Sequence, residues 1–491
     1  MNSLAHGLYG AGQIREAEQF AIQQLQISGG QLMQRAGTAA FAQLQRRWPV
    51  CRTLIVFCGA GNNGGDGYVL ARLAVQAGMV VQVYALVEPD LLQGDALRAC
   101  TGFLQVGGRL DSFAEDIELG GDGVVVDALF GTGLNRQVAG EYAAAIALIN
   151  NSRLPVLAVD TPSGLHADTG CVLGCAVRAQ LTVTFIGLKC GLHTGEAVEY
   201  CGELALETLD LPDKVFTGLT PVATLLEKQG LPPRPRAAHK GSFGHVLLIG
   251  GNLGYSGAIR LAAEAALRSG AGLVSIASRA AHSAVLNIGR PELMCHGVET
   301  VAQLQPLLAK ASVLVIGPGL GQDDWARALF AAALASGKPC VVDADALNLL
   351  ATQRGTAGQW ILTPHPGEAA RLLGCSTADI TADRYAALRA LQQSYGGIVV
   401  LKGAGSLIAD ADSIHVVATG NPGMASGGMG DVLAGVIAAL LAQHLSPLAA
   451  ASQGVYAHGA AADRVAARQG ELGMLASDLF LELGSALTTA T

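Results

Sequence analysis

The segment TLIVFCGAGNNGGDGY, residues 53–68, decides the fold of the first half of the chain. It opens with the apolar run 53–58, rich in β-branched and aromatic side chains, which predicts a buried strand. A glycine-rich turn follows, and the sequence from about residue 66 to residue 77 predicts a helix. A strand that passes through a glycine turn into a helix is the repeating unit of a parallel α/β sheet.

The same alternation continues along the first half. Apolar runs predict further strands at 80–87, 123–130 and 155–160, and helices are predicted at about 12–28 and 30–46, ahead of the first strand. We therefore expect a mostly parallel sheet flanked by helices, with ligands bound at the carboxyl ends of its strands.

A proline-rich segment, KQGLPPRPRAA at 228–238, separates this half from a second one. Proline lacks a backbone N–H, so this stretch cannot continue a helix or a central strand, and we predict a linker. After it, strands are predicted at 245–250, 272–278, 312–317, 339–345, 359–363 and 398–403, separated by alanine-rich helical sequence. The expected architecture is two independent α/β domains, residues 1–220 and 228–491.

Composition excludes several classes of protein. With 51% hydrophobic and 14% charged residues, the 491-residue chain can bury large cores. A net charge of −8 argues against binding nucleic acid or a membrane surface. The N-terminus is not a secretory signal, and no apolar run reaches the ~18 residues that span a bilayer. The 10 scattered cysteines suit reduced thiols in a cytoplasmic protein rather than disulfides or zinc.

The glycine turn of the opening segment carries unusual polar residues. Residues 59–64 satisfy the spacing G-x-G-x-x-G, which is a weak signal in a chain with 64 glycines. Two amides, Asn62 and Asn63, and the acid Asp66 suit a cation or a sugar–phosphate contact. The alternative is an ordinary turn in which Asp66 caps the next helix.

Two later strand ends favour a site over isolated helix caps. The strand at 123–130 contains Asp127 near its end, and the strand at 155–160 ends in Asp160, shortly before Ser163. Because parallel strands end at one edge of a sheet, these groups should converge with the glycine turn.

The second half contains the turn GMGD, residues 428–431, before an apolar helix predicted to begin near Asp431. Backbone N–H groups at a helix start bind anions, and Asp431 could take a proton from a hydroxyl. The alternative is a helix-capping aspartate. Lys402, in LKGAGS, is placed to meet phosphates; His365 is either a ligand contact or part of a rigid turn.

In the same half, Asp343 or Asn348, both in DADALNLL, could point toward this edge of the sheet.

The motifs NNGGDG, DALFGTGLNR and DTPSG, in that order, resemble the NAD(P)HX epimerase family over about residues 10–215. NAD(P)HX is NADH or NADPH hydrated at the nicotinamide ring. The resemblance implies a potassium ion (K+) held by Asn63, Asp127 and Ser163, with Asp160 as the acid/base. Lys189 is either an additional cationic contact or an exposed lysine. The implied contacts with the hydrated cofactor are Asn62, Asn63, Gly64, Gly65, Asp66, Gly131, Thr132, Gly133, Leu134, Asn135, Arg136, Gln137, Tyr142 and Asp160.

The second half resembles the ribokinase-like superfamily and, within it, the NAD(P)HX dehydratases. GPGLG at 317–321, DADALNLL, TPHPGE, LKGAGS and SGGMGDVLAG occur in that order across about residues 225–485. The resemblance implies Asp431 as base, ADP as co-substrate and Mg2+ (magnesium) as charge neutraliser. Implied contacts with the hydrated cofactor are Ala258, Gly319, His365 and Asp431; those with the nucleotide are Lys402, Gly403, Ala404, Gly405, Ser406 and Gly430.

Together these resemblances imply an enzyme that repairs NADHX and NADPHX. The first domain would have a Rossmann-like fold and epimerise the R and S forms. The second would dehydrate the S form with ADP, releasing AMP and phosphate. The alternatives are a ribokinase-like kinase for a small vitamin alcohol, and a non-catalytic nucleotide-binding regulator. We also expect a homo-oligomer, although no segment defines its stoichiometry.

Overall fold

The computed structural model describes residues 6–114, 117, 119–352 and 360–488. The chain divides into two compact units, Met1–Thr224 and Leu225–Thr491. Within the described residues, no helix is long and apolar enough to cross a membrane.

The N-terminal unit contains a parallel sheet with strand order β4-β3-β2-β5-β6-β7-β9. Four strands lie within two residues of the predicted bounds: β2 (Thr53–Cys58), β3 (Val80–Ala85), β5 (Val124–Ala128) and β6 (Val156–Val159). The others are β4 (Leu110–Ser112), β7 (Leu181–Phe185) and β9 (Glu203–Glu207).

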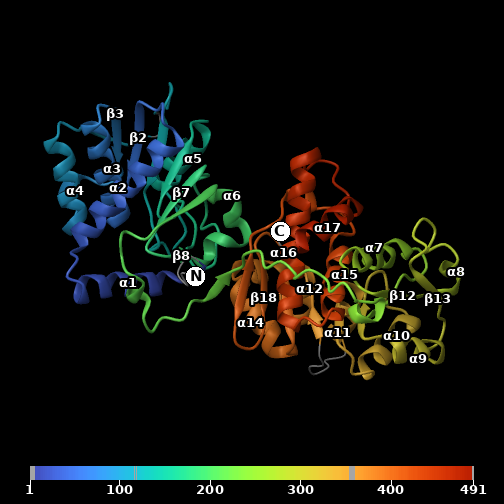
Figure 1. Ribbon diagram of the computed structural model, residues 1–491. Coiled ribbons are helices and arrows are strands. Elements are labelled where there is room, and N and C mark those ends of the chain that lie inside the picture. Colours follow the sequence, from blue (N-terminus) through green and yellow to red (C-terminus); the bar gives the residue numbers. More distant parts are fainter. Residues whose placement is uncertain (1–5, 115–116, 118, 353–359, 489–491) are drawn as a thin grey trace. The chain divides into compact units, whose positions relative to one another are not determined.

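Helices cover both faces of this sheet (Figure 1). Alternate residues of β2 point to opposite faces. Leu54 and Val56 join a core with α1 (Ala11–Gln24), α2 (Gly29–Arg47), α3 (Asn62–Gln76) and α4 (Gly94–Gln105), whereas Ile55 and Phe57 join a core with α5 (Glu141–Asn151). The remaining short elements are α6 (Val198–Cys201), η2 (Pro89–Leu91), η3 (Cys190–His193), η4 (Gly195–Ala197) and η5 (Asp213–Phe216).

Helix α3 begins at Asn62, four residues before the predicted start, so most of the polar turn is helical. Glycine lowers helix stability, but here its missing side chain is what lets the helix approach its neighbours. A Cβ on Gly64 would lie 2.1 Å from the carbonyl oxygen of Gly59, and one on Gly65 would lie 2.4 Å from Cε of Met33. These glycines therefore have a packing role.

Three short strands complete this unit. β1 (Gly7–Tyr9) pairs in parallel with β8 (Leu188–Lys189) and antiparallel with β10 (Ala223–Leu225). Tyr9 is opposite Lys189 in this register. The pairing places Lys189 in the interior of the unit.

The C-terminal unit contains the strand order β13-β12-β11-β14-β15-β16-β17-β18-β19. Strands are parallel from β13 to β17, and β18 and β19 are antiparallel. The predicted α/β class with two mostly parallel sheets is thus confirmed. The bounds are β11 (His245–Ile249), β12 (Leu273–Ser278), β13 (Met294–Gly297), β14 (Val313–Ile316), β15 (Cys340–Val342), β16 (Trp360–Leu362), β17 (Ile398–Leu401), β18 (Ser406–Ala409) and β19 (Ile414–Val417).

Residue 359 of the predicted strand 359–363 lies outside the described residues.

Helix α15 (Met429–Ala442) lies in the centre of this unit and packs on α7 (Ser256–Arg268) and α16 (Pro447–Gln469). It is almost wholly buried, which its apolar sequence requires. The other helices are α8 (Ala280–Ser283), α9 (Val301–Lys310), α10 (Asp324–Ala335), α11 (Asp345–Thr352), α12 (Pro366–Leu373), α13 (Thr377–Ala382), α14 (Arg384–Tyr395) and α17 (Phe480–Leu487), with η6 (Lys240–Phe243), η7 (Pro422–Met424) and η8 (Ala476–Leu479).

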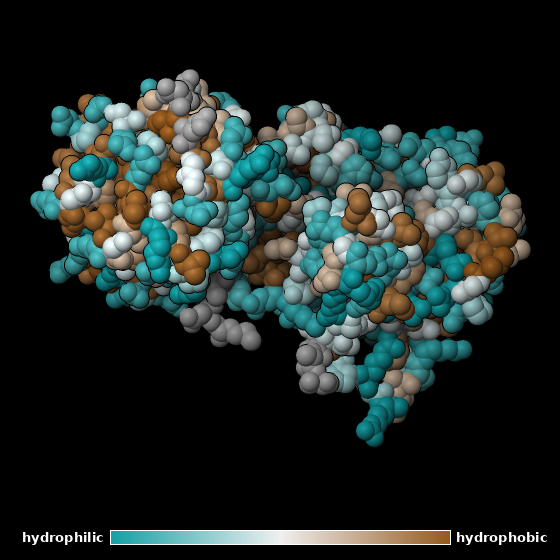
Figure 2. Space-filling model, turned by 90° about the horizontal axis from the view of Figure 1, so that it is seen from above, coloured by the Kyte–Doolittle hydropathy of each residue, from teal (hydrophilic) through white to brown (hydrophobic). Residues whose placement is uncertain are grey.

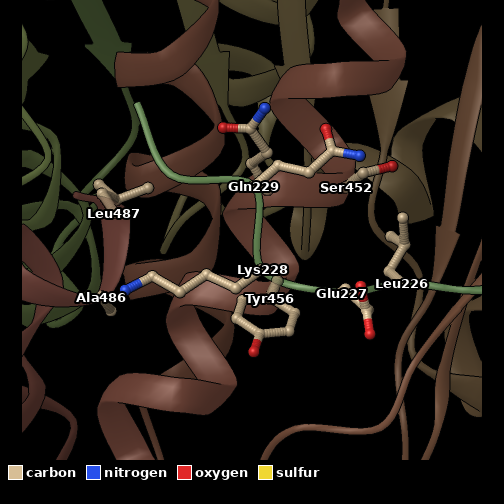
Figure 3. A pocket seen from close by; sticks show the side chains of 9 residues that line it. Leu226, Glu227, Lys228, Gln229, Ser452, Tyr456, Ala486 and Leu487 are labelled. Carbon is tan, nitrogen blue, oxygen red and sulfur yellow. The ribbon is translucent and has the colours of Figure 1, made fainter. Parts of the chain in front are cut away.

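Part of the predicted linker packs on the C-terminal unit. The backbone N–H of Leu231 donates to the carbonyl of Leu487 at 2.7 Å. The neighbouring residues 226–229 border a small hollow against Tyr456 and Ser452 of α16 (Figure 3). Its volume of about 10 Å³ has room for about one water molecule, so it is not a nucleotide site.

Figure 2 shows hydrophilic residues over much of the visible face, with hydrophobic ones among them. Exposed apolar side chains include Val50 and Val80 in the N-terminal unit and Leu253 and Tyr255 in the C-terminal unit. Exposed apolar residues of this kind are normal in a globular protein.

Candidate active sites

The N-terminal unit contains a cavity of about 680 Å³, within the size range of small-molecule sites. It lies where β2, β5 and β6 end, and α1 and β8 contribute to its wall. Gly64, Gly65 and Gln137, which the resemblance also implied, are not among its lining residues. The implied residues that do line it are Asn62, Asn63, Asp66, Gly131, Thr132, Gly133, Leu134, Asn135, Arg136, Tyr142 and Asp160.

Asp160 and Lys189 form an ion pair in the wall of this cavity. Lys189 Nζ lies 2.5 Å from Asp160 Oδ1, and the lysine side chain is fully buried. The exposed-lysine interpretation is therefore wrong, because β8 carries Lys189 into the interior. Asp160 follows directly after β6 and has a left-handed backbone with φ of +65°.

A second polar cluster lies beneath the cavity. Asp127 Oδ1 accepts from Ser163 Oγ at 2.6 Å, and Asp127 Oδ2 accepts from the Ser163 N–H at 2.8 Å. Burial raises the pKa of Asp127 to about 6, although the hydrogen bonds from Ser163 oppose this. Within the described residues, neither polar atom of the buried Asn63 amide has a hydrogen-bond partner. Such an orphaned group in an oxygen-rich cluster fits a bound cation.

Glu18, Asp66 and Asp95 also line the cavity, and the first two have raised pKa values. Burial raises the pKa of Glu18, on α1, and raises the pKa of Asp66 well above its usual range; the nearby Asp160 charge acts in the same direction on both. Asp66 does not cap its helix, because the N-cap of α3 is Gly61. Glu18 could not be predicted from the sequence, since nothing in its local pattern distinguishes it from a solvated helix residue.

In the C-terminal unit, Lys402 joins several acids at the carboxyl edge of the sheet. Its Nζ lies 2.8 Å from Asp343 Oδ1 and 3.7 Å from Glu368 Oε2. A Cβ on Gly430 would lie 3.3 Å from Lys402 Nζ, so the lysine is beside the first turn of α15. Asp343, rather than Asn348, therefore reaches this edge; Asn348 instead accepts a hydrogen bond from Arg371 at 2.8 Å.

Asp431 belongs to the same cluster. The N-cap of α15 is Gly428, with φ of +91°, so Asp431 lies inside the first turn and is not the capping residue. Burial raises the pKa of Asp431 to about 7, Asp343 adds to the increase, and Lys402 opposes it. A buried carboxyl that titrates near neutral pH is suited to general-base chemistry.

The other implied contacts surround this cluster. Gly319 has φ of +58°, and a Cβ there would lie 3.3 Å from the Cβ of Ala258, so the two residues are neighbours. His365 caps α12: its Nδ1 accepts from the Gly367 N–H at 3.0 Å, which supports the rigid-turn interpretation. Its side chain is also 51% exposed, so the imidazole remains accessible to a ligand.

These two sites can be compared with known families. The family described as "NAD(P)H-hydrate dehydratase" matches residues 246–484, and the one described as "YjeF-related protein N-terminus" matches residues 29–191. A bifunctional NAD(P)H-hydrate repair enzyme of Coxiella burnetii is 50% identical over 97% of this chain and 98% of its own length. The chain belongs to the family of bifunctional NAD(P)H-hydrate repair enzymes.

A second relative agrees with this assignment. The bifunctional NAD(P)H-hydrate repair enzyme of Escherichia coli is 45% identical over 98% of this chain and 94% of its own. A solved structure, the ADP/ATP-dependent NAD(P)H-hydrate dehydratase of Bacillus subtilis co-crystallized with ATP/Mg2+, is 30% identical and covers 52% of this chain and 93% of its own, with a TM-score of 0.48.

A buried residue that no sequence motif indicated supports the turn 402–406 of the C-terminal site. Arg384, on α14, is buried and donates to the backbone carbonyls of Leu401, Lys402 and Gly405 at 3.3–3.5 Å. Its guanidinium thus supports the turn 402–406 from behind. Only the tertiary fold reveals this, because Arg384 and the turn are far apart in sequence.

Proposed function

We propose that the N-terminal unit interconverts the R and S epimers of NADHX and NADPHX, and that the C-terminal unit dehydrates the S epimer with ADP, releasing AMP and phosphate. Residues 1–220 would carry the first activity and residues 228–491 the second. The observation that carries the proposal is the placement of Asp431 beside Lys402 at the start of α15, in a chain of this family.

In the N-terminal site, Asp160 exchanges a proton with the hydrated ring. Epimerisation breaks and remakes bonds at the hydroxyl-bearing carbon, so one carboxylate that accepts and returns a proton is sufficient. Asp160 is 15% exposed, which agrees with a group that faces the cavity. The glycine loop 131–133 and Tyr142, which line the same cavity, would contact the hydrated cofactor.

Asn63, Asp127 and Ser163 would hold the potassium ion. The unpartnered amide oxygen of Asn63 and the buried carboxylate of Asp127 are the oxygen ligands that a hard cation prefers. When bound, the ion would supply the positive charge that neutralises the buried Asp127 carboxylate. Asp160 keeps its own contacts and is not a ligand.

In the C-terminal site, Asp431 takes the proton of the ring hydroxyl. The oxygen attacks the β-phosphorus of ADP, and AMP leaves. The ring nitrogen lone pair then expels phosphate, and loss of a proton from the adjacent carbon restores the double bond. Backbone N–H groups at the start of α15 stabilise the transferred phosphoryl group. Lys402 and the turn 402–406 bind the nucleotide.

Magnesium would enter this site on the nucleotide phosphates. Among the described residues, no three His, Cys, Asp or Glu side chains are grouped as a metal site. Mg2+ is typically held by one or two carboxylates together with substrate phosphates, so an acidic rim without a preformed cage fits it. When bound, it neutralises charge on the phosphates.

A mixture of both hydrate epimers tests the proposal through recovery of reduced-cofactor absorbance with ADP, with ATP and with neither. The wild type should convert the whole mixture. Asp431→Asn should stop dehydration but still interconvert epimers, and Asp160→Asn should convert only the S fraction promptly. A stable phosphorylated product without recovery of NADH would instead indicate a kinase. The homo-oligomer and the cytoplasmic location stay predictions, which sedimentation and cell fractionation test.

A further inference from the structure

Lys189 uses all of its hydrogen-bonding capacity inside the protein. An ammonium group carries three N–H donors. Lys189 Nζ donates to Asp160 Oδ1 at 2.5 Å, to Thr184 Oγ1 at 2.8 Å and to the Phe185 carbonyl at 2.8 Å. The side chain is fully buried. No donor is left for a substrate, so any role of Lys189 acts through Asp160.

The two oxygens of Asp160 are consequently inequivalent. Oδ1 accepts from Lys189 and, at 3.3 Å, from the Phe185 N–H. Oδ2 accepts no hydrogen bond within the described part of the chain, and a Cβ on Gly131 would lie 3.2 Å from it. Oδ2 therefore faces the glycine loop that lines the cavity.

The backbone of Asp160 is also held in an unusual conformation. A φ of +65° is unfavourable for a residue with a side chain. It persists because the Asp160 N–H donates to the carbonyl of Val183 at 2.8 Å and the carboxyl group is held by Lys189. Both constraints come from β7 and the segment after it, so they fix the carboxyl group from behind the cavity.

We propose that Lys189 is the positioning residue of the N-terminal site: it fixes the carboxyl group of Asp160 through Oδ1, so that Oδ2 alone exchanges the proton. The proposal rests on the epimerase function proposed above. Lys189 is not a catalytic residue, because it does not reach the substrate.

The charges around Asp160 explain why a buried cation is needed. Glu18 on α1 and Asp66 on α3 both interact with Asp160, and Lys189 on β8 interacts favourably with all three acids. Arg15 and Asp95 act on Glu18 from the rim. Two neighbouring carboxyl groups disfavour a third negative charge, and Lys189 offsets them by direct contact.

The experiment compares Lys189→Met, which keeps the length of the side chain and removes its charge, with Lys214→Met, an exposed lysine of the same unit. Epimerisation and ADP-dependent dehydration are measured on the full-length protein. For Lys189→Met we expect kcat of epimerisation at neutral pH to fall by about 10²-fold with KM nearly unchanged. Dehydration of the S epimer, and both activities of Lys214→Met, should equal wild type.

Three outcomes distinguish the possibilities. A wild-type kcat in Lys189→Met would overturn the proposal, as would a raised KM with unchanged kcat, which would place the lysine on the substrate. A wild type that does not epimerise would refute the proposed function instead. If Lys189→Met does not fold, Thr184→Val provides the test. This variant keeps the charge of Lys189 but removes the hydroxyl that accepts one of its hydrogen bonds. Its kcat of epimerisation should fall several-fold at constant KM, and an unaltered kcat would overturn the proposal.

Discussion

Asp431 should make dehydration strongly dependent on pH. Burial, aided by Asp343, raises the pKa of Asp431 to about 7, and a general base acts only when ionised. At about pH 6 roughly one molecule in eleven has the carboxylate, and at about pH 8 roughly ten in eleven do. The wild-type kcat/KM for dehydration should therefore rise roughly tenfold between these values and then level off.

Two variants should move the rising, acidic limb of the dehydration pH profile in opposite directions. Asp343→Asn removes a negative neighbour and leaves Lys402 less neutralised, so both effects favour ionised Asp431 and the limb moves to lower pH. Lys402→Met removes the cation that opposes the rise in the pKa of Asp431, so the acidic limb moves to higher pH. Each shift should be about one pH unit or more.

The assay is the initial rate of NADH recovery from S-NADHX at saturating ADP and subsaturating hydrate. The terminal phosphate of ADP also titrates near neutral pH, so each variant is compared with wild type at the same ADP saturation, and the difference between the two profiles is the quantity to compare. A profile flat from about pH 6 to pH 8, or a shift of both variants in one direction, would refute Asp431 as the base.

Three further predictions follow from single contacts. Gly403→Ala should raise KM for ADP about tenfold in steady-state assays, because φ is +144° and the new Cβ would lie 2.8 Å from Nη1 of Arg384. Replacing K+ by Li+ should slow wild-type epimerisation but leave Asn63→Leu, already slow, unaffected, with dehydration as the control. Asp431→Asn should stabilise the C-terminal unit above pH 7 by a few kcal/mol. The folded-state pKa of Asp431 is raised to about 7, so the wild type loses stability as the pH rises toward and through that value, whereas the neutral asparagine does not. Thermal unfolding of both proteins at several pH values measures the difference.

The elements that could be predicted from sequence are those whose burial pattern is local. Strand β2 was placed correctly because it is an uninterrupted apolar run of six residues between a polar entry and a glycine turn. Strand β9 (Glu203–Glu207) was missed because it has no uninterrupted apolar run: its first residue is exposed and the other four are only half-buried. Strands β1 and β8 were missed because three- and two-residue strands exist only through their mutual pairing.

The sites divide in the same way. Asp127, Asp160 and Asp431 could be proposed because each follows, or closes, a predictable strand or turn, and the edge rule for parallel sheets brings such groups together. The burial of Lys189 could not be predicted, since its partner Asp160 is 29 residues away and the intervening chain includes β7. Arg384 is comparable: a helix residue's contact with a turn across the sheet leaves no local signature.

The two proposed bases differ in how their lysines are placed, and this has a consequence for the combined reaction. In the N-terminal unit Lys189 contacts the base Asp160 directly, whereas in the C-terminal unit Lys402 contacts Asp343 and only influences the base Asp431. A direct contact fixes the position of a base, whereas a more distant charge only changes its electrostatic environment. Removing Lys189 should therefore lower kcat of epimerisation at every pH, whereas removing Lys402 should move the acidic limb of the dehydration profile. If Lys189→Met regained the wild-type kcat of epimerisation at high pH, the difference in lysine placement could not be what governs the two bases.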